Sequence, residues 1–154
     1  MNNRRQNLKY IFFDFFAAII SWTLFFVYRK TFIEPHKFGY EIPIELDTKY
    51  ILALVIIPVF WIFLYLLSGY YKSPYRKSRL QELGQTFFVT LLGVTVIFFA
   101  FILDDWVSTY KDYYYSFVIL FCLQFLLTYS PRLIITTNAN HKIKSKKIWF
   151  NTLI

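Results

Sequence analysis

The sequence has little charge and almost no cysteine. Only 17% of its 154 residues are charged, against about 25% in an average soluble domain. The single cysteine, Cys122, excludes an internal disulfide and a cysteine-based zinc site. Four glycines and five prolines are too few for a fibrous or disordered chain. The sequence contains no glycine-rich phosphate loop, serine-nucleophile motif, zinc-helix motif or kinase signature, so we assign no catalytic residue and no metal ligand.

Apolar residues make up 57% of the chain and aromatic residues 23%, more than a soluble domain of this size could bury. A helix needs about 20 apolar residues to cross a hydrocarbon core about 30 Å thick. Four runs meet this requirement, at residues 10–28, 50–67, 86–103 and 113–129. They lack the alternation of barrel strands. The sequence therefore predicts an all-α membrane protein with four transmembrane helices in an antiparallel bundle.

Lysine and arginine are unequally distributed between the two sides of the predicted bundle. Twelve of them lie before the first run, between the second and third, or after the fourth, and five lie on the opposite side. Short segments rich in these residues stay in the cytoplasm. We therefore expect both termini to be cytoplasmic, with residues 1–145 as the membrane region. Because the basic residues all adjoin the spans, their charge does not indicate nucleic-acid binding.

Tyrosines gather where the predicted spans end. The outer boundary receives Tyr28, Tyr50 and Tyr110 to Tyr115, together with Trp106, and the inner boundary receives Tyr65, Tyr70 and Tyr71. Aromatic side chains are enriched at membrane–water interfaces. The pattern predicts an interfacial belt at each surface.

Asp14 is the one acidic residue within the four runs. An ionisable group at that depth is costly and usually faces protein or water. Two cytoplasmic arginines, Arg79 and Arg132, are candidate partners, and the alternative is a shallow carboxylate that reaches interfacial water. Gln124, in the fourth run, is interpreted as an interhelical hydrogen-bonding residue.

Two prolines bear on the course of the helices. Pro58 falls within the second run, where it removes a backbone donor and predicts a kink. Pro131 follows the fourth run, and the residue before a proline avoids helical geometry. We therefore expect the fourth helix to bend or end near Ser130.

Several small residues on the first and third runs would permit close helix contact. The alternative is that they are scattered residues that face lipid. They are Ala17 and Ser21 on the first helix, and Gly84, Gly93 and Ala100 on the third.

The segment between the second and third runs is basic, aromatic and amphipathic. A helical turn here would direct its cations toward headgroups and Leu80 and Leu83 toward the bundle. Guanidinium groups suit phosphate because they are always charged and donate in pairs. Lys72, Arg76 and Arg79 are therefore candidate ligands for a lipid phosphate, and the alternative is ordinary positive-inside topology.

Four motifs together resemble the membrane region of the polytopic bacterial polyprenyl glycosylphosphotransferases, and the resemblance extends over essentially the whole chain. The motifs are Leu8-Lys9-Tyr10 with Asp14, Ser68-Gly69-Tyr70-Tyr71, Tyr75-Arg76-Lys77-Ser78-Arg79 with Glu82-Leu83-Gly84-Gln85-Thr86, and Pro131-Arg132. The resemblance implies a multi-pass protein of the bacterial inner (cytoplasmic) membrane. It would anchor a sugar transferase that moves hexose 1-phosphate from a nucleotide sugar to undecaprenyl phosphate, at the start of exopolysaccharide, capsule or O-antigen synthesis.

Members of that family continue into cytoplasmic domains that carry catalysis, and the complete enzyme would use Mg²⁺. Residues 146–154 are interpreted as a linker and the first strand of such a domain, so the expected partners are the bilayer, undecaprenyl phosphate and the chain's own further domains. No catalytic residue of the family can be placed on this sequence. The alternative is a stand-alone four-helix membrane interaction or transport module. The sequence leaves open whether the helices form a homo-oligomer.

Overall fold

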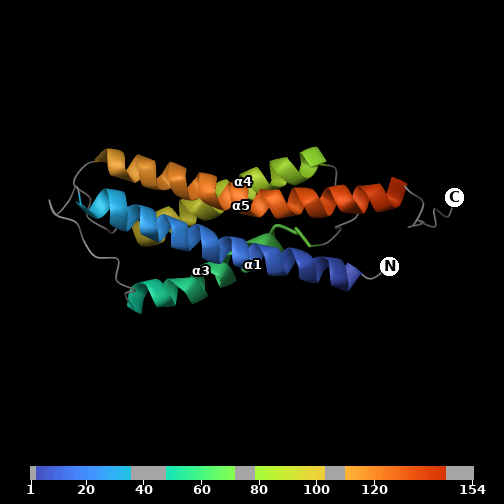
Figure 1. The fold of residues 1–154 in the computed structure, drawn as a ribbon, viewed down its shortest axis with the longest axis horizontal. Helices are drawn as coiled ribbons and strands as arrows, with labels where there is room; N and C mark the ends of the chain where they lie inside the picture. The colour runs from blue at the N-terminus through green and yellow to red at the C-terminus, as the bar shows by residue number, and fades with distance from the viewer. Residues whose placement is uncertain (1–2, 36–47, 72–78, 103–109, 145–154) are drawn as a thin grey trace.

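The computed structural model describes residues 3–35, 48–71, 79–102 and 110–144, and all the regular structure in these ranges is helical (Figure 1). The long helices are α1 (Asn3–Tyr28), α3 (Thr48–Leu67), α4 (Arg79–Ile97) and α5 (Tyr110–Lys144). Two short π-helical segments, η1 (Arg29–Ile33) and η2 (Phe98–Ile102), continue α1 and α4. The predicted all-α fold with four long helices is confirmed.

The helices pack in the order α3, α1, α5, α4. The α1–α5, α1–α3 and α4–α5 pairs form the extensive contacts, and α3 touches α4 over a smaller area. The start of α1 and the end of α5 lie at the same end of the bundle (Figure 1). We call this the terminal end, and the other the opposite end. Hydrogen bonds from Tyr10 to Thr136 and from Arg132 to Asp14 show that α1 and α5 are antiparallel.

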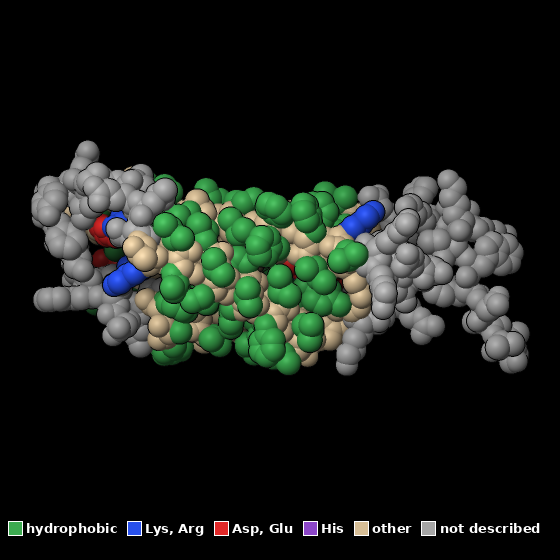
Figure 2. Space-filling model, turned by 90° about the horizontal axis from the view of Figure 1, so that it is seen from below, with side chains coloured by type: hydrophobic (Ala, Val, Ile, Leu, Met, Phe, Trp, Pro, Cys, Tyr) green, Lys and Arg blue, Asp and Glu red, His purple; other side chains and the backbone are tan. Residues whose placement is uncertain are grey.

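The outer surface has the composition that lipid requires. Four segments are long and apolar enough to cross a membrane: Asn7–Ile33, Thr48–Leu67, Arg79–Phe101 and Tyr110–Thr137. Large apolar side chains on them point outward; Phe88, for example, is 69% exposed and Val55 65%. Figure 2 shows apolar side chains over the middle of the molecule, with the Lys and Arg side chains in view near its two ends. The chain is therefore a multi-pass membrane protein.

The fourth helix does not end near Ser130, as Pro131 had suggested. Helix α5 passes through Pro131 and reaches Lys144, so its 35 residues extend about 50 Å, well beyond a hydrocarbon core of about 30 Å. Proline is tolerated inside membrane helices because neighbouring helices and hydroxyl side chains stabilise the local backbone. Here Arg132, the residue after the proline, is bonded to Asp14 of α1. That contact holds the second half of α5 against α1.

The face of α4 that packs into the bundle is also not the one predicted, which carried Leu80 and Leu83. Leu80 is 79% exposed and Leu83 is exposed, whereas Glu82, Thr86 and Thr90 are buried. Lipid is as apolar as leucine, so leucine gains little by turning inward, while a polar side chain gains a protein environment. The interior face of α4 therefore begins with polar residues at intervals of four.

Small residues bring the helices close at the middle of the bundle. Ala17 and Ser21 are buried on α1, and Gly93 of α4 lies directly against Trp61 of α3. The close-contact prediction is confirmed for these three residues. It is wrong for Gly84, where an added Cβ would meet nothing within 4 Å, and for Ala100, which is exposed.

Helix α3 contributes one continuous buried stripe, which includes Ala53, Ile57, Trp61 and Tyr65. Pro58 is buried inside this helix, which runs without interruption through it. The kink expected at Pro58 stays a prediction.

Candidate functional site

The most unusual feature of the interior is an ion pair between the first and last helices. Arg132 Nε donates to Asp14 Oδ1 at 2.8 Å, and Nη2 donates to Oδ2 at 2.6 Å. Both side chains have no solvent exposure. A paired, bidentate geometry offsets the large cost of removing two charges from water. Of the two candidate arginines, the partner of Asp14 is therefore Arg132.

The guanidinium of this pair lies over two tyrosine rings. Arg132 Cζ lies 4.2 Å from the ring centroid of Tyr65 and 3.6 Å from that of Tyr70. Cation–π attraction is strongest where both groups are shielded from water, as they are here. The two rings are also in edge contact with each other, with centroids 5.7 Å apart. The cation thus lies over two aromatic rings and is also bonded to the Asp14 carboxylate.

Tyr70 reaches Arg132 because the chain turns sharply after α3. Gly69 has a φ of 67°, in the left-handed region that glycine adopts without strain. The amide of Tyr70 donates to the carbonyl of Tyr65 at 3.0 Å, and the amide of Ser68 donates to that of Leu64 at 3.0 Å. These bonds satisfy carbonyls at the end of the helix. The turn directs the next two side chains back into the bundle.

Tyr71 completes the contacts of Asp14. Its hydroxyl donates to Asp14 Oδ2 at 2.8 Å, so the carboxylate receives three hydrogen bonds from two residues. Burial, followed by the nearby charge of Asp14, raises the pKa of Tyr71 well above its ordinary value. The phenol therefore keeps its proton and acts as a donor across the physiological range.

Tyr70 links the same cluster to α4. Its hydroxyl bonds to the Thr86 hydroxyl and lies 3.2 Å from the carbonyl oxygen of Glu82. Thr86 in turn donates to that carbonyl at 2.7 Å. Burial raises the pKa of Tyr70, so it too remains protonated and can donate. The amide of Gln85 adds a second connection, because its Nε2 donates to the carbonyl of Ser68 at 3.0 Å.

Gln124 lies next to this cluster, and its side-chain amide bonds within its own helix. Its Nε2 donates to Thr128 Oγ1 at 3.1 Å, one turn along α5. Tyr65 of α3 lies near the same oxygen, with its hydroxyl donating at 3.4 Å. The Gln124 amide thus bonds within its own helix, and the Thr128 hydroxyl that it contacts also bonds to Tyr65 of α3. Gln124 is buried, as expected of a structural polar residue.

One further bond extends the cluster toward the ends of the chain. The hydroxyls of Tyr10 and Thr136 lie 3.0 Å apart, one turn beyond the Asp14–Arg132 pair. Both side chains are buried. The polar cluster, which we define as Asp14, Arg132, Tyr65, Tyr70 and Tyr71 with these bonded neighbours, therefore joins all four long helices.

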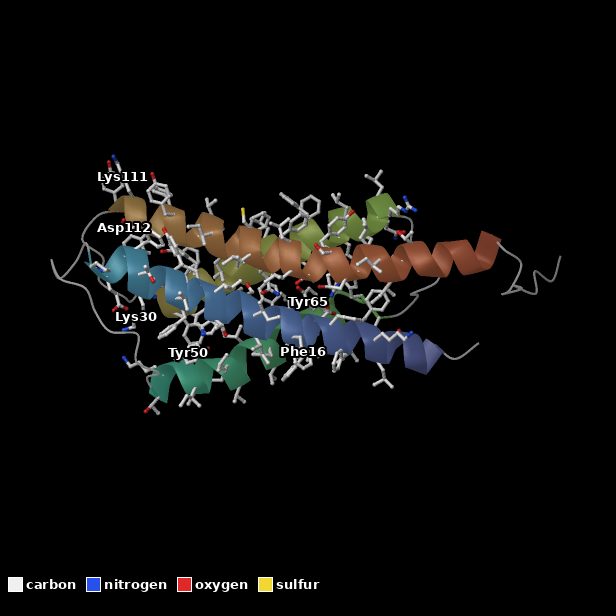
Figure 3. The ribbon with its side chains drawn as sticks, viewed as in Figure 1. Phe16, Lys30, Tyr50, Tyr65, Lys111 and Asp112 are labelled. Atoms are coloured by element: carbon white, nitrogen blue, oxygen red, sulfur yellow. The ribbon has the colours of Figure 1, made fainter. Side chains whose placement is uncertain are left out.

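The interfacial-belt prediction is wrong for part of its residues, although Tyr110, Tyr114 and Tyr115 at the start of α5 are exposed, as a belt requires. Tyr65 and Tyr70 are almost completely buried and contact an ion pair. Tyr50, assigned to the outer belt, is also buried and lies 2.9 Å from the hydroxyl of Thr23. In Figure 3 the Tyr65 side chain lies between the helices, while Phe16 points away from the bundle. Hydroxyl-bearing rings at span ends are thus used here to join helices.

The candidate phosphate ligands are only partly described. Arg79 is exposed at the first position of α4, and Lys72 and Arg76 lie outside the described residues. Residues 146–154, expected to start a further domain, also lie outside them.

Sequence reasoning missed the burial of Glu82 and the role of both turn tyrosines. A signal was present: polar residues recur every fourth position on α5 from Gln124 to Thr136, and they do so on α4 at Glu82, Thr86 and Thr90. The buried polar residues of α5 are Ser116, Gln124, Thr128, Arg132 and Thr136.

The opposite end of the bundle has a simpler arrangement. Lys30 and Glu34 form an ion pair at 2.9 Å within one turn. Figure 3 shows Lys30, Lys111 and Asp112 at this same end. These charges are partly exposed, and such pairs contribute little to stability. No comparable buried ion pair occurs there among the residues described.

The described residues do not suit the Mg²⁺ that the family resemblance implies for a complete enzyme. No three His, Cys, Asp or Glu side chains come together in the part of the chain that the structure describes. Asp14 is already bonded to a guanidinium and a phenol, neither of which is a magnesium ligand. None of the described residues is therefore assigned a role in binding Mg²⁺.

No family model matches the chain, and comparison with curated proteins and with solved structures likewise finds no match.

Proposed function

We propose that this chain is the membrane region of a polyprenyl glycosylphosphotransferase, which holds the catalytic part of a sugar transferase beside its lipid substrate. The transferase would move hexose 1-phosphate from a nucleotide sugar to undecaprenyl phosphate in the bacterial inner membrane. Confining an enzyme to the surface that contains its substrate raises the effective concentration of that substrate. Both termini would then be cytoplasmic.

The observation that carries the proposal is where the residues of the resemblance lie. The sequence motifs lie far apart along the chain; Asp14 and Arg132, for example, are separated by 118 positions. Yet Asp14, the Ser68–Tyr71 turn, the Glu82–Thr86 segment and Arg132 belong to one bonded cluster at the terminal end. Residues shared with a family for separate reasons need not meet in this way. Their convergence favours a common function at that membrane surface.

The lipid-phosphate hypothesis concerns Lys72, Arg76 and Arg79. Arg79 lies at the start of α4, one turn before the buried Glu82, and is exposed. A helix start is favourable for an anion because its first amide groups lack partners in the helix. A phosphate in this position would also meet the positive charge of the sequence between α3 and α4.

The hypothesis is tested by lipid binding in nanodiscs of neutral lipid, with undecaprenyl phosphate as the probe and undecaprenol as its phosphate-free counterpart. We expect Arg76→Gln with Arg79→Gln to weaken undecaprenyl phosphate binding about tenfold or more, since each guanidinium–phosphate bond is charge-assisted. Lys49→Gln with Lys111→Gln removes the same charge from exposed positions at the opposite end. Equal binding by both double variants would contradict the proposed lipid site.

The assignment to a longer transferase is tested by the intact mass of the native polypeptide in its source membranes. An antibody against residues 29–49 would locate it without affecting the terminal end. A mass well above 18.7 kDa supports the proposal. A mass near that value favours the alternative, a stand-alone four-helix membrane module, and would assign any catalysis to a separate protein.

A further inference from the structure

The first two turns of α4 are fixed to the turn that follows α3. The Tyr70 hydroxyl bonds to Thr86 and lies 3.2 Å from the Glu82 carbonyl oxygen. Gln85 Nε2 reaches back to the Ser68 carbonyl at 3.0 Å. Helix α4 has only limited contact with α3. These side-chain bonds therefore fix the start of α4 to the turn that follows α3.

Tyr70 is held in turn by the ion pair. Its ring lies 3.6 Å from Arg132 Cζ, and Arg132 is bonded twice to Asp14. Tyr70 is 2% exposed, so it does not itself face the membrane surface. A continuous series of contacts thus leads from α1 and α5, through Tyr70, to the first turn of α4. Arg79 is the residue at which that helix begins.

We infer that Tyr70 is a positioning residue for lipid-phosphate recognition, because it sets the depth and rotation of the first turn of α4 and thereby the place of the Arg79 guanidinium. This inference rests on the proposed function, in which Arg79 contacts a phosphate headgroup. A paired guanidinium–phosphate contact depends strongly on geometry. Rotation or sliding of α4 by a fraction of a turn would therefore weaken binding even though no phosphate ligand had been changed.

The structure offers a closely matched pair of variants. Tyr65 and Tyr70 are both buried, and the Arg132 guanidinium lies over both rings. Tyr70→Phe keeps the ring and removes the bonds to α4. Tyr65→Phe also keeps its ring but removes a bond to Thr128, which lies on α5. Both variants lose one buried hydroxyl, and only the first releases the start of α4.

The experiment measures binding of undecaprenyl phosphate to the full chain in neutral nanodiscs, with undecaprenol as the comparison. We expect Tyr70→Phe to bind about three to ten times more weakly, as the loss of one or two hydrogen bonds predicts. Tyr65→Phe should change binding by less than about twofold, and neither variant should alter undecaprenol binding. Similar phosphate-dependent losses in both variants would overturn the inference, because a general loss of structure would then explain them.

A double-variant cycle with Arg79→Gln separates positioning from a merely structural role. If Tyr70 acts through Arg79, Tyr70→Phe should have little further effect once Arg79 is replaced. Fully additive losses would overturn the inference. If Arg79→Gln weakens binding but Tyr70→Phe does not, the inference fails and the proposed lipid site stands. If Arg79→Gln has no effect, the proposed contact at Arg79 fails, and the inference with it.

Circular dichroism should show unchanged helix content in each variant. If Tyr70→Phe does not fold, Thr86→Val weakens the same contact from the α4 side, and the same loss of phosphate-dependent binding is expected. Retained binding in that variant would contradict the inference.

Discussion

The two halves of this bundle are held together by different kinds of contact. Around the terminal end, Asp14, Tyr70 and Arg132 form directed bonds in the interior. Toward the opposite end, residues such as Phe25 and Ile97 form an apolar core that is extended by aromatic pairs. Lipid competes well for apolar surface, so apolar side chains by themselves distinguish weakly between a neighbouring helix and lipid. Directed polar contacts have no such alternative in hydrocarbon.

This difference indicates a division of roles. The polar half specifies which helices are neighbours and how far they are shifted relative to one another along the bundle axis, because an ion pair and its hydrogen bonds are satisfied in one arrangement. The apolar half contributes close packing, which depends on shape, as at Trp61 and Gly93. Variants that remove a contact from one half at a time would test this division.

Arg132→Gln should have the largest effect. It leaves the Asp14 carboxylate buried without its cation, and breaking a buried pair in this way costs about 3–5 kcal/mol. The measurement is the free energy of unfolding in mixed micelles, followed by circular dichroism as SDS is added. Asp14→Asn combined with Arg132→Gln removes both charges and should recover part of the loss. A double variant with the summed loss of both single variants would show that the two residues do not act as a pair.

Gly93→Ala should follow, as the corresponding test of the apolar half. A Cβ at Gly93 would overlap the Trp61 ring and lie 2.8 Å from a Leu64 methyl carbon. Overpacking of this kind costs about 1–3 kcal/mol. Gly84→Ala is the matched control on the same helix, since an added Cβ there meets nothing within 4 Å. It should raise stability by up to about 1 kcal/mol through helix propensity. A stable Gly93→Ala variant would contradict the close contact of α3 with α4.

How much of this could be read from the sequence differs between the two halves. The four spans followed directly from runs of apolar residues, since length and composition decide whether a helix can cross a bilayer. Asp14 was recognised as needing a partner, because its burial cost does not depend on the details of packing. The choice of Arg132 over Arg79 depended on which helices are neighbours, and the sequence gives no direct information on that.

The errors come from reasoning on local sequence where contacts between helices decide the outcome. Their position at the span end placed Tyr65 and Tyr70 at the membrane interface, although both are buried between helices. Leu80 and Leu83 were placed in the interior, as in a protein whose outside is water. In lipid that preference weakens or reverses, and the recurrence of polar residues every fourth position marks the interior better. The local geometry of Pro131 predicts a bend or an end of the helix near Ser130, whereas α5 continues through it to Lys144 and is bonded to α1 at Arg132.

Tyr71→Phe should have a smaller effect than either core variant. It removes one of three hydrogen bonds to Asp14, and we expect a loss of about 1 kcal/mol. In the wild type, burial and then the charge of Asp14 raise the pKa of Tyr71. Arg132 acts in the opposite direction, and Tyr65 raises the pKa further. A raised pKa means that the folded state holds the proton more tightly than the unfolded state. The contribution of the phenol to the free energy of unfolding is therefore complete below about pH 10 and declines as the pH rises further. The variant should therefore lose stability less steeply above pH 10. Parallel curves for the two proteins would contradict this assignment.

Tyr50→Phe should have the smallest effect, and it completes the comparison between the two halves. Its hydroxyl lies 2.9 Å from Thr23 Oγ1, so the variant removes one buried phenol bond, as Tyr71→Phe does. Thr23 still donates to the Ile19 carbonyl at 2.8 Å, so no buried group is left without a partner. We expect a loss of about 0.5 kcal/mol, since the larger cost of removing a hydrogen bond comes from the group left behind. If Tyr50→Phe is as damaging as Tyr71→Phe, directed bonds matter equally in both halves, and the ion pair does not set the polar half apart.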